Sequence, residues 1–260
     1  MANSPSGESM VHRMVRIVEA FDAEHPTLSA ADLARRSGLP SSTTYRLVDE
    51  LLAESLLDRE GQQLRLGTRL WELVSRGSKV LGLREAALPF MEDVQSIVGH
   101  HTALGILDQN DVLYIERIGS NTSTINITRV AGRLPIHATS SGLLLTAFGP
   151  AEKQNLFLAR RHPQLTDLTV TDPEELRRLL AEIRRTGYCV QSGTIVPESA
   201  GVAVPVFTAN GTAIAALSVV IPREGAPVQK SITALQTAAR GISRALGWDG
   251  TLRDAIRRSL

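Results

Sequence analysis

The sequence contains little that would support a secreted, disulfide-stabilised or membrane-spanning protein. One cysteine in 260 residues cannot form an internal disulfide, and a chain of this length can bury enough apolar surface to fold without one. The first ten residues (MANSPSGESM) lack both a basic and an apolar region, so we expect no signal peptide. The most apolar stretches, such as 213–221, reach about half of the roughly 18 residues that a membrane span needs. We therefore expect a cytoplasmic protein with no membrane contact.

An excess of positive charge is also missing. The chain carries 28 Lys plus Arg against 27 Asp plus Glu, a formal net charge of +1. Residues 1–67 hold seven Arg, no Lys and ten acidic residues, a balance of −3. Binding to a polyanion must therefore depend on a few cationic residues at particular positions, because the net charge of the chain gives no overall attraction. We expect any non-specific binding to a polyanion to be weak.

Motifs typical of enzymes are absent as well. The sequence has no Gly-x-Ser-x-Gly, no Gly-x-Gly-x-x-Gly, no phosphate-binding P-loop and no His-Glu-x-x-His. His100 and His101 are adjacent, so on a strand they would point to opposite faces and could not share a metal simply. We expect His137 to be a satisfied core or loop histidine and Cys189 to be a small buried apolar group. The prediction is a protein without catalysis, cofactor or metal.

The first part of the chain has the pattern of consecutive short helices. Apolar residues at three- and four-residue spacing predict a helix over 11–24 that ends at His25-Pro26. Ser29 and Asp32 form a capping box for a second, short helix. Gly38 is expected to stop that helix, which gives the turn between two helices.

A third helix and a hairpin complete this pattern. Ser41 is expected to cap the third helix, and the segment 56–67 has two short strands joined across a glycine. Three helices followed by a hairpin are the layout of a winged helix-turn-helix. We assign it to residues 11–67, after a disordered N-terminus over 1–10.

The third helix would enter the major groove of DNA, because an α-helix fits that groove and its first residues reach base edges. If the leucines of this helix face the core, hydroxyl side chains and one arginine point outward in its first half, and acidic side chains point outward in its second half. We expect DNA contacts from that half and from the hairpin: Ser41, Ser42, Thr43, Tyr45, Arg46, Arg59, Gln62 and Arg65. A ligand-sensing or scaffold protein whose helix-turn-helix serves dimerisation only is the alternative.

The rest of the chain divides into a connector and a mixed domain. Residues 68–98 have a helical period, with Gly77 and Gly82 as expected breaks or hinges. Strand and helix patterns then alternate over 99–248, which predicts an α+β domain, followed by a tail over 249–260. The expected strands are 102–107, 112–118, 124–130, 188–191, 201–207 and 212–221, and the expected helices are 141–148, 151–159, 174–186 and 228–246.

Three separated stretches resemble the IclR family of bacterial transcriptional regulators. They are the run LSAADLARRSGLPSSTTYRLVDEL (28–51) with RIV (16–18) before it and LRLG (64–67) after it, the segment LPIHATSSGLLLTA (134–147), and the closing segments IRRTGY (183–188), GVAVPVF (201–207) and AALSV (215–219). The resemblance covers nearly the whole chain in the same order. It implies a winged-helix domain, a linker helix and a GAF-like effector-binding domain.

The resemblance also implies partners. Such regulators assemble as a dimer or a dimer of dimers on operator DNA, and they respond to small, often acidic or aromatic metabolites. We expect a regulator of this kind, with a repressor favoured over an activator. Its helical connector would couple the effector site to the DNA site.

The resemblance implies effector-binding residues by their position in the family. The sequence itself adds one argument, from the start of a helix. The start of the helix after His137 offers hydroxyls and free amides, which favour an anion; the same hydroxyls could simply cap the helix. The expected set is Thr139, Ser140, Ser141, Gln191 and Ser218. Leu143 stands where the family commonly has Lys or Arg, and the strand after Tyr188 is uncharged. We therefore expect a more neutral pocket than in relatives.

Overall fold

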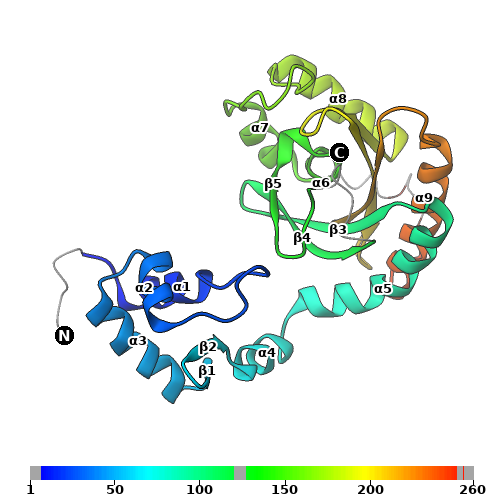
Figure 1. Ribbon diagram of the computed structural model, residues 1–260. Helices are drawn as coiled ribbons and strands as arrows, with labels where there is room; N and C mark the ends of the chain where they lie inside the picture. Colours follow the sequence, from blue (N-terminus) through cyan, green and yellow to red (C-terminus); the bar gives the residue numbers. More distant parts are fainter. Residues whose placement is uncertain (1–6, 120–126, 251–253, 255–260) are drawn as a thin grey trace. The chain divides into compact units, whose positions relative to one another are not determined.

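The chain forms two compact units, Met1–Lys79 and Val80–Leu260 (Figure 1). The computed structural model describes residues 7–119, 127–250 and 254. Each unit has its own hydrophobic core. Among the residues described, no helix combines the length and the apolar character that crossing a bilayer requires.

The N-terminal unit is the predicted winged helix-turn-helix, followed by one more helix. Its core contains apolar residues from all three helices and the hairpin, including Ile17, Leu33, Leu47 and Leu64. The two strands pair in antiparallel register, with Leu57 opposite Leu66. The elements are α1 (Met10–Glu19), α2 (Ala30–Ser37), α3 (Ser41–Ala53), β1 (Leu57–Glu60), β2 (Gln63–Leu66) and α4 (Thr68–Ser75).

Local signals set the turn between α2 and α3. The Ser29 hydroxyl accepts from the Asp32 amide at 3.1 Å, as the capping box predicts. Gly38 ends α2 with φ of +65°, a left-handed conformation that glycine adopts without strain. The expected cap of α3 is wrong: Pro40 is the N-cap and Ser41 is the first helical residue. Because a proline side chain has no hydrogen-bond acceptor, no side-chain cap is formed at this helix start.

The first helix is shorter than the pattern indicates. It ends at Glu19 and not at His25-Pro26, because the amides of Ala20 and Phe21 bond back to Ile17 and Val18 in a tightened turn. This turn brings Phe21 into the core of the unit. The apolar residues beyond Glu19 therefore belong to the turn that leads into α2, and not to α1.

The predicted connector consists of two helices that belong to different units. The break expected at Gly77 is confirmed, since α4 ends at Ser75 and α5 runs over Lys79–Val98. The break expected at Gly82 is wrong, because Gly82 lies inside α5. A glycine inside a helix costs about 1 kcal/mol, and α5 compensates by burying one face, including Leu83 and Met91, in the core of the C-terminal unit.

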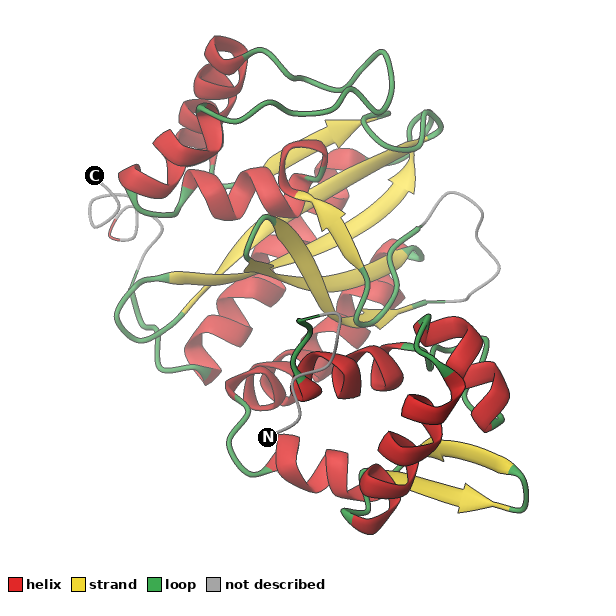
Figure 2. Cartoon of the chain, turned by 90° about the vertical axis from the view of Figure 1, so that its left-hand side faces the viewer, coloured by secondary structure: helices red, strands yellow, loops and turns green. Residues whose placement is uncertain are grey.

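The C-terminal unit is an α+β domain built on one sheet (Figure 2). All pairings between its neighbouring strands are antiparallel, in the order β5-β4-β3-β8-β7-β6. One face packs against α5 and α9, and the other packs against α6, α7 and α8. The elements are β3 (His101–Asp108), β4 (Asp111–Ile118), β5 (Arg133–Pro135), α6 (Ser140–Ala147), α7 (Ala151–Leu158), α8 (Pro173–Thr186), β6 (Cys189–Ser192), β7 (Ser199–Phe207), β8 (Ala213–Pro222) and α9 (Val228–Ala245).

Most of these elements agree with the predicted ranges. The strand expected over 124–130 is the exception: residues 127–130 are not in a strand, and the rest of that range lies outside the described residues. The short strand β5 was not predicted. It pairs with β4 through Asp111 to Leu113, so its strand state depends on a partner and not on a local pattern.

Candidate effector cavity and nucleic-acid surface

A cavity opens in the C-terminal unit where α6 begins. Its walls come from the sheet strands β4, β7 and β8, the end of β6 and the loop that follows it. The empty space between the side chains is about 480 Å³ with its mouth included, and the centre of a water molecule can reach about 50 Å³ of it. This space suits a ligand of few heavy atoms.

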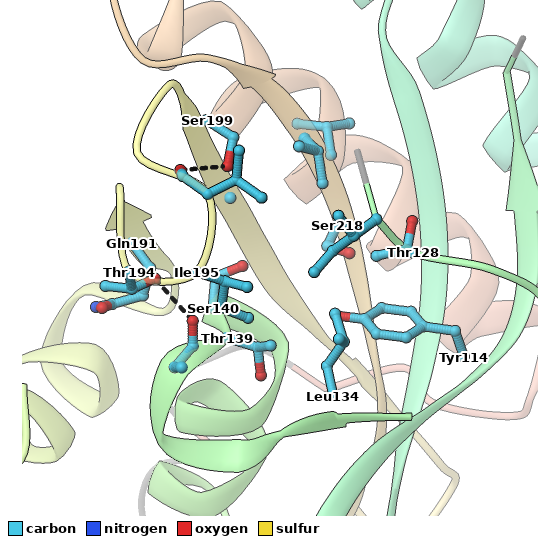
Figure 3. A pocket seen from close by; sticks show the side chains of 16 residues that line it. Tyr114, Thr128, Leu134, Thr139, Ser140, Gln191, Thr194, Ile195, Ser199 and Ser218 are labelled. Carbon is cyan, nitrogen blue, oxygen red and sulfur yellow. Dashed lines mark hydrogen bonds between the residues drawn. The ribbon is translucent and has the colours of Figure 1, made fainter. Parts of the chain in front are cut away.

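The cavity is polar without being charged. The described residues that line it include hydroxyl and amide side chains but none that carries a charge. Figure 3 shows these polar side chains, which several elements supply: Tyr114, Thr128, Thr139, Ser140, Gln191, Thr194, Ser199 and Ser218. Such groups donate and accept hydrogen bonds at short range, so they can orient a small polar ligand.

Tyr114 brings a buried hydroxyl to the cavity from β4. Its side chain is almost fully buried, and this burial raises its pKa to about 12. Burial disfavours the phenolate because the charge would lose its hydration. Tyr114 is therefore a neutral hydrogen-bonding group over the whole physiological range.

The start of α6 forms another wall. Thr139 is its N-cap, and its hydroxyl accepts from the Gly142 amide at 3.1 Å. Within the described chain, the Ser140 and Ser141 amides donate to no protein acceptor. A Cβ on Gly142 would lie 2.4 Å from the Ile136 carbonyl oxygen, so this glycine is required for the close turn into the helix. Free amides at a helix start favour an anion.

The structure brings most of the predicted effector residues together. Thr139, Ser140, Gln191 and Ser218 all line the cavity, although strands and loops far apart in the sequence supply them. Ser141 is buried behind the wall, beside Tyr114. The capping alternative also holds for Thr139, so this residue both caps α6 and faces the cavity.

Several cavity residues were missed by the sequence analysis. Tyr114 could have been found, since it is the one aromatic residue in the predicted strand 112–118. Thr194 lies on the loop after β6, and Ser199 lies where that loop enters β7, so no periodicity indicates the direction of either side chain. Thr194 donates to the Ala138 carbonyl at 2.7 Å, and Thr169 donates to the Thr194 carbonyl at 2.8 Å. These bonds hold the loop against the start of α6.

A second candidate surface lies in the N-terminal unit, on α3 and the hairpin. The predicted DNA-binding residues are exposed there, except that Thr43 is half-buried. Tyr45 is 52% exposed and not at the boundary of the core. Thr44, Leu47, Val48 and Leu51 are buried, so the helix presents the expected face outward.

The arginines of this surface are paired with carboxylates. Arg46 contacts Glu50 at 2.5 Å, one turn along α3, and Arg59 lies 4.0 Å from Asp49 of the same helix. Arg65 pairs with acids of the hairpin itself. Both Arg59 and Arg65 are exposed, but Arg59 is opposite Leu64 in the ladder and Arg65 is opposite Asp58. The side chains of the two arginines therefore project from opposite faces of the hairpin.

Comparison with known proteins gives this arrangement a family. Residues 10–61 match the family described as "IclR helix-turn-helix domain", and residues 77–244 match "Bacterial transcriptional regulator IclR C-terminal". The chain belongs to the IclR family.

Individual IclR-family members match over nearly the whole chain. The HTH-type transcriptional regulator XynR of Escherichia coli is 33% identical over 92% of this chain and 97% of its own length. KdgR of the same organism is 27% identical over 94% and 95%. An IclR homolog from Microbacterium hydrocarbonoxydans, solved in complex with 4-hydroxybenzoate, is 46% identical with a TM-score of 0.84, over 92% of this chain and 99% of that one.

These matches make the protein a ligand-responsive, DNA-binding transcriptional regulator and not an enzyme. The alternative of a scaffold that uses its helix-turn-helix only for dimerisation is set aside with them. The fold agrees: a helix-turn-helix unit and an effector-binding α+β unit, as in solved IclR structures.

One departure from the IclR-family pattern has a structural explanation. Leu143, at the position where Lys or Arg is common, is fully buried in the core between α6 and α8. A charge there would lie among apolar side chains. Glu198, the nearest acid after β6, is exposed.

The histidines and the cysteine of this IclR-family member have ordinary structural roles. His137 is buried and its Nε2 lies 2.8 Å from the Pro163 carbonyl oxygen, with its ring stacked on His162. Burial raises the pKa of the Cys189 thiol to about 12, which removes its nucleophilic form at neutral pH. In the described ranges, no group of three or more His, Cys, Asp and Glu side chains could hold a metal.

Proposed function

We propose that this regulator binds a small aromatic or short-chain carboxylate in the cavity at the start of α6, and that the ligand changes its affinity for operator DNA. The uncharged, hydroxyl-lined cavity carries the proposal. A carboxylate there would accept from the free amides of Ser140 and Ser141 and from nearby hydroxyls, since the described lining contains no lysine or arginine. The ring of an aromatic acid would contact Leu134, Ile195 and Val219.

4-Hydroxybenzoate is the first ligand to test. It is the acid bound in the Microbacterium relative, which shares 46% of its sequence with this chain. Its phenol and carboxylate are both groups that hydroxyl side chains can recognise. Thr139, Ser140, Ser141, Gln191 and Ser218 are the proposed effector residues, with Ser141 acting through Tyr114.

On the DNA side, we propose that α3 enters the major groove. Arg46 would contact a guanine edge or a phosphate, and Tyr45 would pack on the backbone. The hydroxyls of Ser41, Ser42 and Thr43 would hold phosphates or bases. Arg59, Gln62 and Arg65 would reach the flanking groove, and the opposite directions of the two arginines make Arg59 the better placed beside α3.

We further propose a homodimer or a dimer of dimers. Helix α4 has no buried residue in the chain as described, yet Trp71 is 61% exposed and Leu73 and Val74 are about half exposed. A helix this apolar needs a partner surface, since exposed apolar patches mark protein contacts. A second copy that covers α4 would also double the arginines presented to one operator. Such a DNA-binding protein works in the cytoplasm, where the operator is.

Repression is the proposed outcome, because it requires only that the protein occupy its operator. Binding is measured by fluorescence anisotropy on an operator selected from random duplexes, with and without 4-hydroxybenzoate. We expect operator affinity to fall with salt, because phosphate contacts release counterions, and to change when the ligand is added.

Ser140→Leu tests the cavity in the same assay. A leucine there fills the space beside Gly201, so the effect of 4-hydroxybenzoate on operator affinity should disappear while operator binding remains. Ser96→Leu, on the exposed side of α5, is the matched control. An unchanged ligand response in Ser140→Leu would contradict the assignment of this cavity.

A further inference from the structure

Glu116 is an unusual residue of the effector-binding unit. It is 6% exposed, and among the described residues it is the only carboxylate that is buried to this extent. Its Oε2 accepts from Arg84 Nε of α5 at 2.5 Å, and its Oε1 accepts from the Arg117 amide at 2.8 Å. A buried carboxylate is expensive unless it is paired and hydrogen-bonded. The ion pair between Glu116 and Arg84 therefore fixes β4 against α5.

The direction of Glu116 depends on a β-bulge. Leu104 of β3 is opposite Glu116, but the next residue, Gly105, is opposite Tyr114. Ile115 is thus an extra residue in β4. In a regular strand, residues two apart share a face, so Tyr114 and Glu116 would both face the cavity.

The bulge separates these two side chains. Tyr114 faces the cavity, whereas Ile115 packs with Leu104 in the core that α5 covers, and Glu116 reaches Arg84. Bulges commonly re-aim side chains beside functional sites. Here the bulge keeps a negative charge out of the neutral cavity and directs it to a helix on the other face of the sheet.

Helix α5 is continuous in the chain with the DNA-binding unit. It begins at Lys79, the last residue of that unit, and Arg84 lies in its second turn. A displacement of this end of α5 must pass along the backbone through Arg76 to Ser78 into α4. The Glu116–Arg84 pair is therefore the described polar contact that joins the cavity strand to the helix nearest the junction.

We propose that Glu116 and Arg84 are positioning residues for the ligand response, and that the Ile115 bulge is the adjustable element. A ligand that contacts Tyr114 shifts the bulged segment of β4, and the ion pair moves the start of α5 with it. This inference rests on the proposed ligand site in the cavity. Packed elements of this kind have discrete arrangements, so a small shift can select between them.

A purely stabilising role predicts different behaviour. Only the carboxylate of this pair is buried, since the Arg84 side chain is 40% exposed. Removing both charges together is much less destabilising than removing one of them, because no buried charge is left without a partner. A variant without both charges should therefore fold as the wild type does. If the pair transmits the ligand signal, the same variant should bind ligand and DNA but lose the connection between them.

The test compares the wild-type full chain with the double variant Arg84→Met, Glu116→Gln and with Arg185→Met. Arg185 forms an exposed pair with Glu182 on α8 and provides the matched control. Ligand binding is measured by calorimetry with 4-hydroxybenzoate, and operator Kd by anisotropy with and without it. The wild-type ratio of operator Kd values should lie in the usual range for coupling of about 5 to 150.

In the double variant we expect this ratio to fall to within about twofold of 1, with the ligand Kd changed by less than about threefold. The control should keep the wild-type ratio. A double variant that retains the wild-type ratio overturns the proposal. So does a control that loses it equally, because any lost ion pair would then have the same effect.

Hydrogen exchange without ligand separates this inference from the ligand assignment. If the pair fixes α5 to β4, amides of residues 83–86, which are bonded within the helix, should exchange at least about fivefold faster in the single variant Glu116→Gln and at the wild-type rate in Arg185→Met. Unchanged exchange over 83–86 overturns the proposal by itself. If instead 4-hydroxybenzoate fails to bind the wild type, the proposed ligand is wrong, and the exchange result still decides whether the pair fixes α5.

Discussion

The two units of this regulator manage charge in opposite ways. In the N-terminal unit, each of the seven arginines up to residue 67 lies within 4.0 Å of a carboxylate, and most of these pairs are at the surface. In the C-terminal unit, the described lining of the cavity has no charge, and the nearby Glu116 points to the other face of the sheet. The surface of the N-terminal unit thus holds its arginines in ion pairs that can be exchanged for other partners, whereas the cavity of the C-terminal unit has no charged lining.

This difference follows from what each site must bind. DNA presents a dense line of phosphates, so exposed arginines can exchange a weak intramolecular partner for a phosphate when the operator is reached. A small metabolite offers only a few polar atoms, and its recognition depends on donors held in place before it arrives. We therefore expect the acidic balance of the first unit to limit non-specific binding without removing its arginines.

The largest expected effect is on the charged side of the comparison. Arg46→Ala should weaken operator binding by about 10- to 100-fold, since a good base contact is worth about 1–3 kcal/mol. Anisotropy titration with operator and with unrelated duplex measures it. Arg35→Ala, on the exposed side of α2 and paired with Asp32, should change operator binding by less than about threefold. Equal operator affinity of Arg46→Ala and wild type would mean that α3 has been placed wrongly.

The next effect concerns the neutral cavity. A Cβ on Gly201 would lie 2.8 Å from Ser140 Oγ, so Gly201→Ala should narrow the cavity and lower the affinity for 4-hydroxybenzoate about 10-fold. Calorimetry measures the ligand Kd, and operator affinity should stay unchanged. Gly82→Ala is the control: it has open space around it and should raise helix stability by about 0.5–1 kcal/mol. Tight ligand binding by Gly201→Ala would place the ligand elsewhere.

A smaller effect should sharpen the role of the paired acids. Glu50→Gln releases Arg46 from its carboxylate partner and removes a negative charge near DNA. Affinity for unrelated duplex should rise about threefold, more than affinity for the operator, so the ratio of specific to non-specific binding should fall. Glu72→Gln, which removes the partner of Arg76 on α4, is the matched control. No change in non-specific binding would show that Glu50 does not restrain Arg46.

The last prediction concerns the pH dependence of stability that Tyr114 causes, which is the smallest of these effects at neutral pH. Because its pKa is raised to about 12 in the fold, its stabilising contribution is complete below the unfolded value of about 10 and is lost as pH rises from there toward 12. The loss should be on the order of 2 kcal/mol. Denaturant unfolding of wild type and Tyr114→Phe between pH 8 and 12 measures it, with phenolate absorbance as the direct readout. A Tyr114 that ionises near the ordinary tyrosine value of about 10 would contradict the buried position.

Much of the fold could be predicted because the signals are local. The capping box at Ser29, the glycine stop at Gly38 and the alternation in the hairpin each act within a few residues, and all three are confirmed. The errors are also informative. Gly82 looks like a break in isolation, but tertiary burial of Leu83 and Met91 overrides its weak helix propensity. The end of the first helix depends on the packing of Phe21 in the core of the unit. The residues that form this core come from later segments of the chain, so the sequence around Phe21 does not indicate it.

The cavity was only partly predictable for the same reason. Ser140 and Thr139 follow from a helix start, which is a local feature. Tyr114 of β4, Thr194 of the loop after β6 and Ser199 at the start of β7 share the cavity only because the fold brings these segments together. No local pattern indicates this for Thr194 and Ser199. The partner of Arg59 is likewise on α3, ten residues earlier in the chain, and is set by how the hairpin packs.

By itself, the sequence indicated most of the helices and strands, and it predicted a nearly neutral effector site and DNA binding through a few arginines. Periodicity and caps were the basis for the first, and the family resemblance and the charge count for the other two. Only the tertiary structure decided that Ile115 is an extra residue opposite β3, so that Tyr114 faces the cavity and Glu116 faces α5. The sequence of a strand predicts side chains that alternate between the two faces of the sheet. Only pairing with a neighbouring strand shows where a bulge interrupts this alternation.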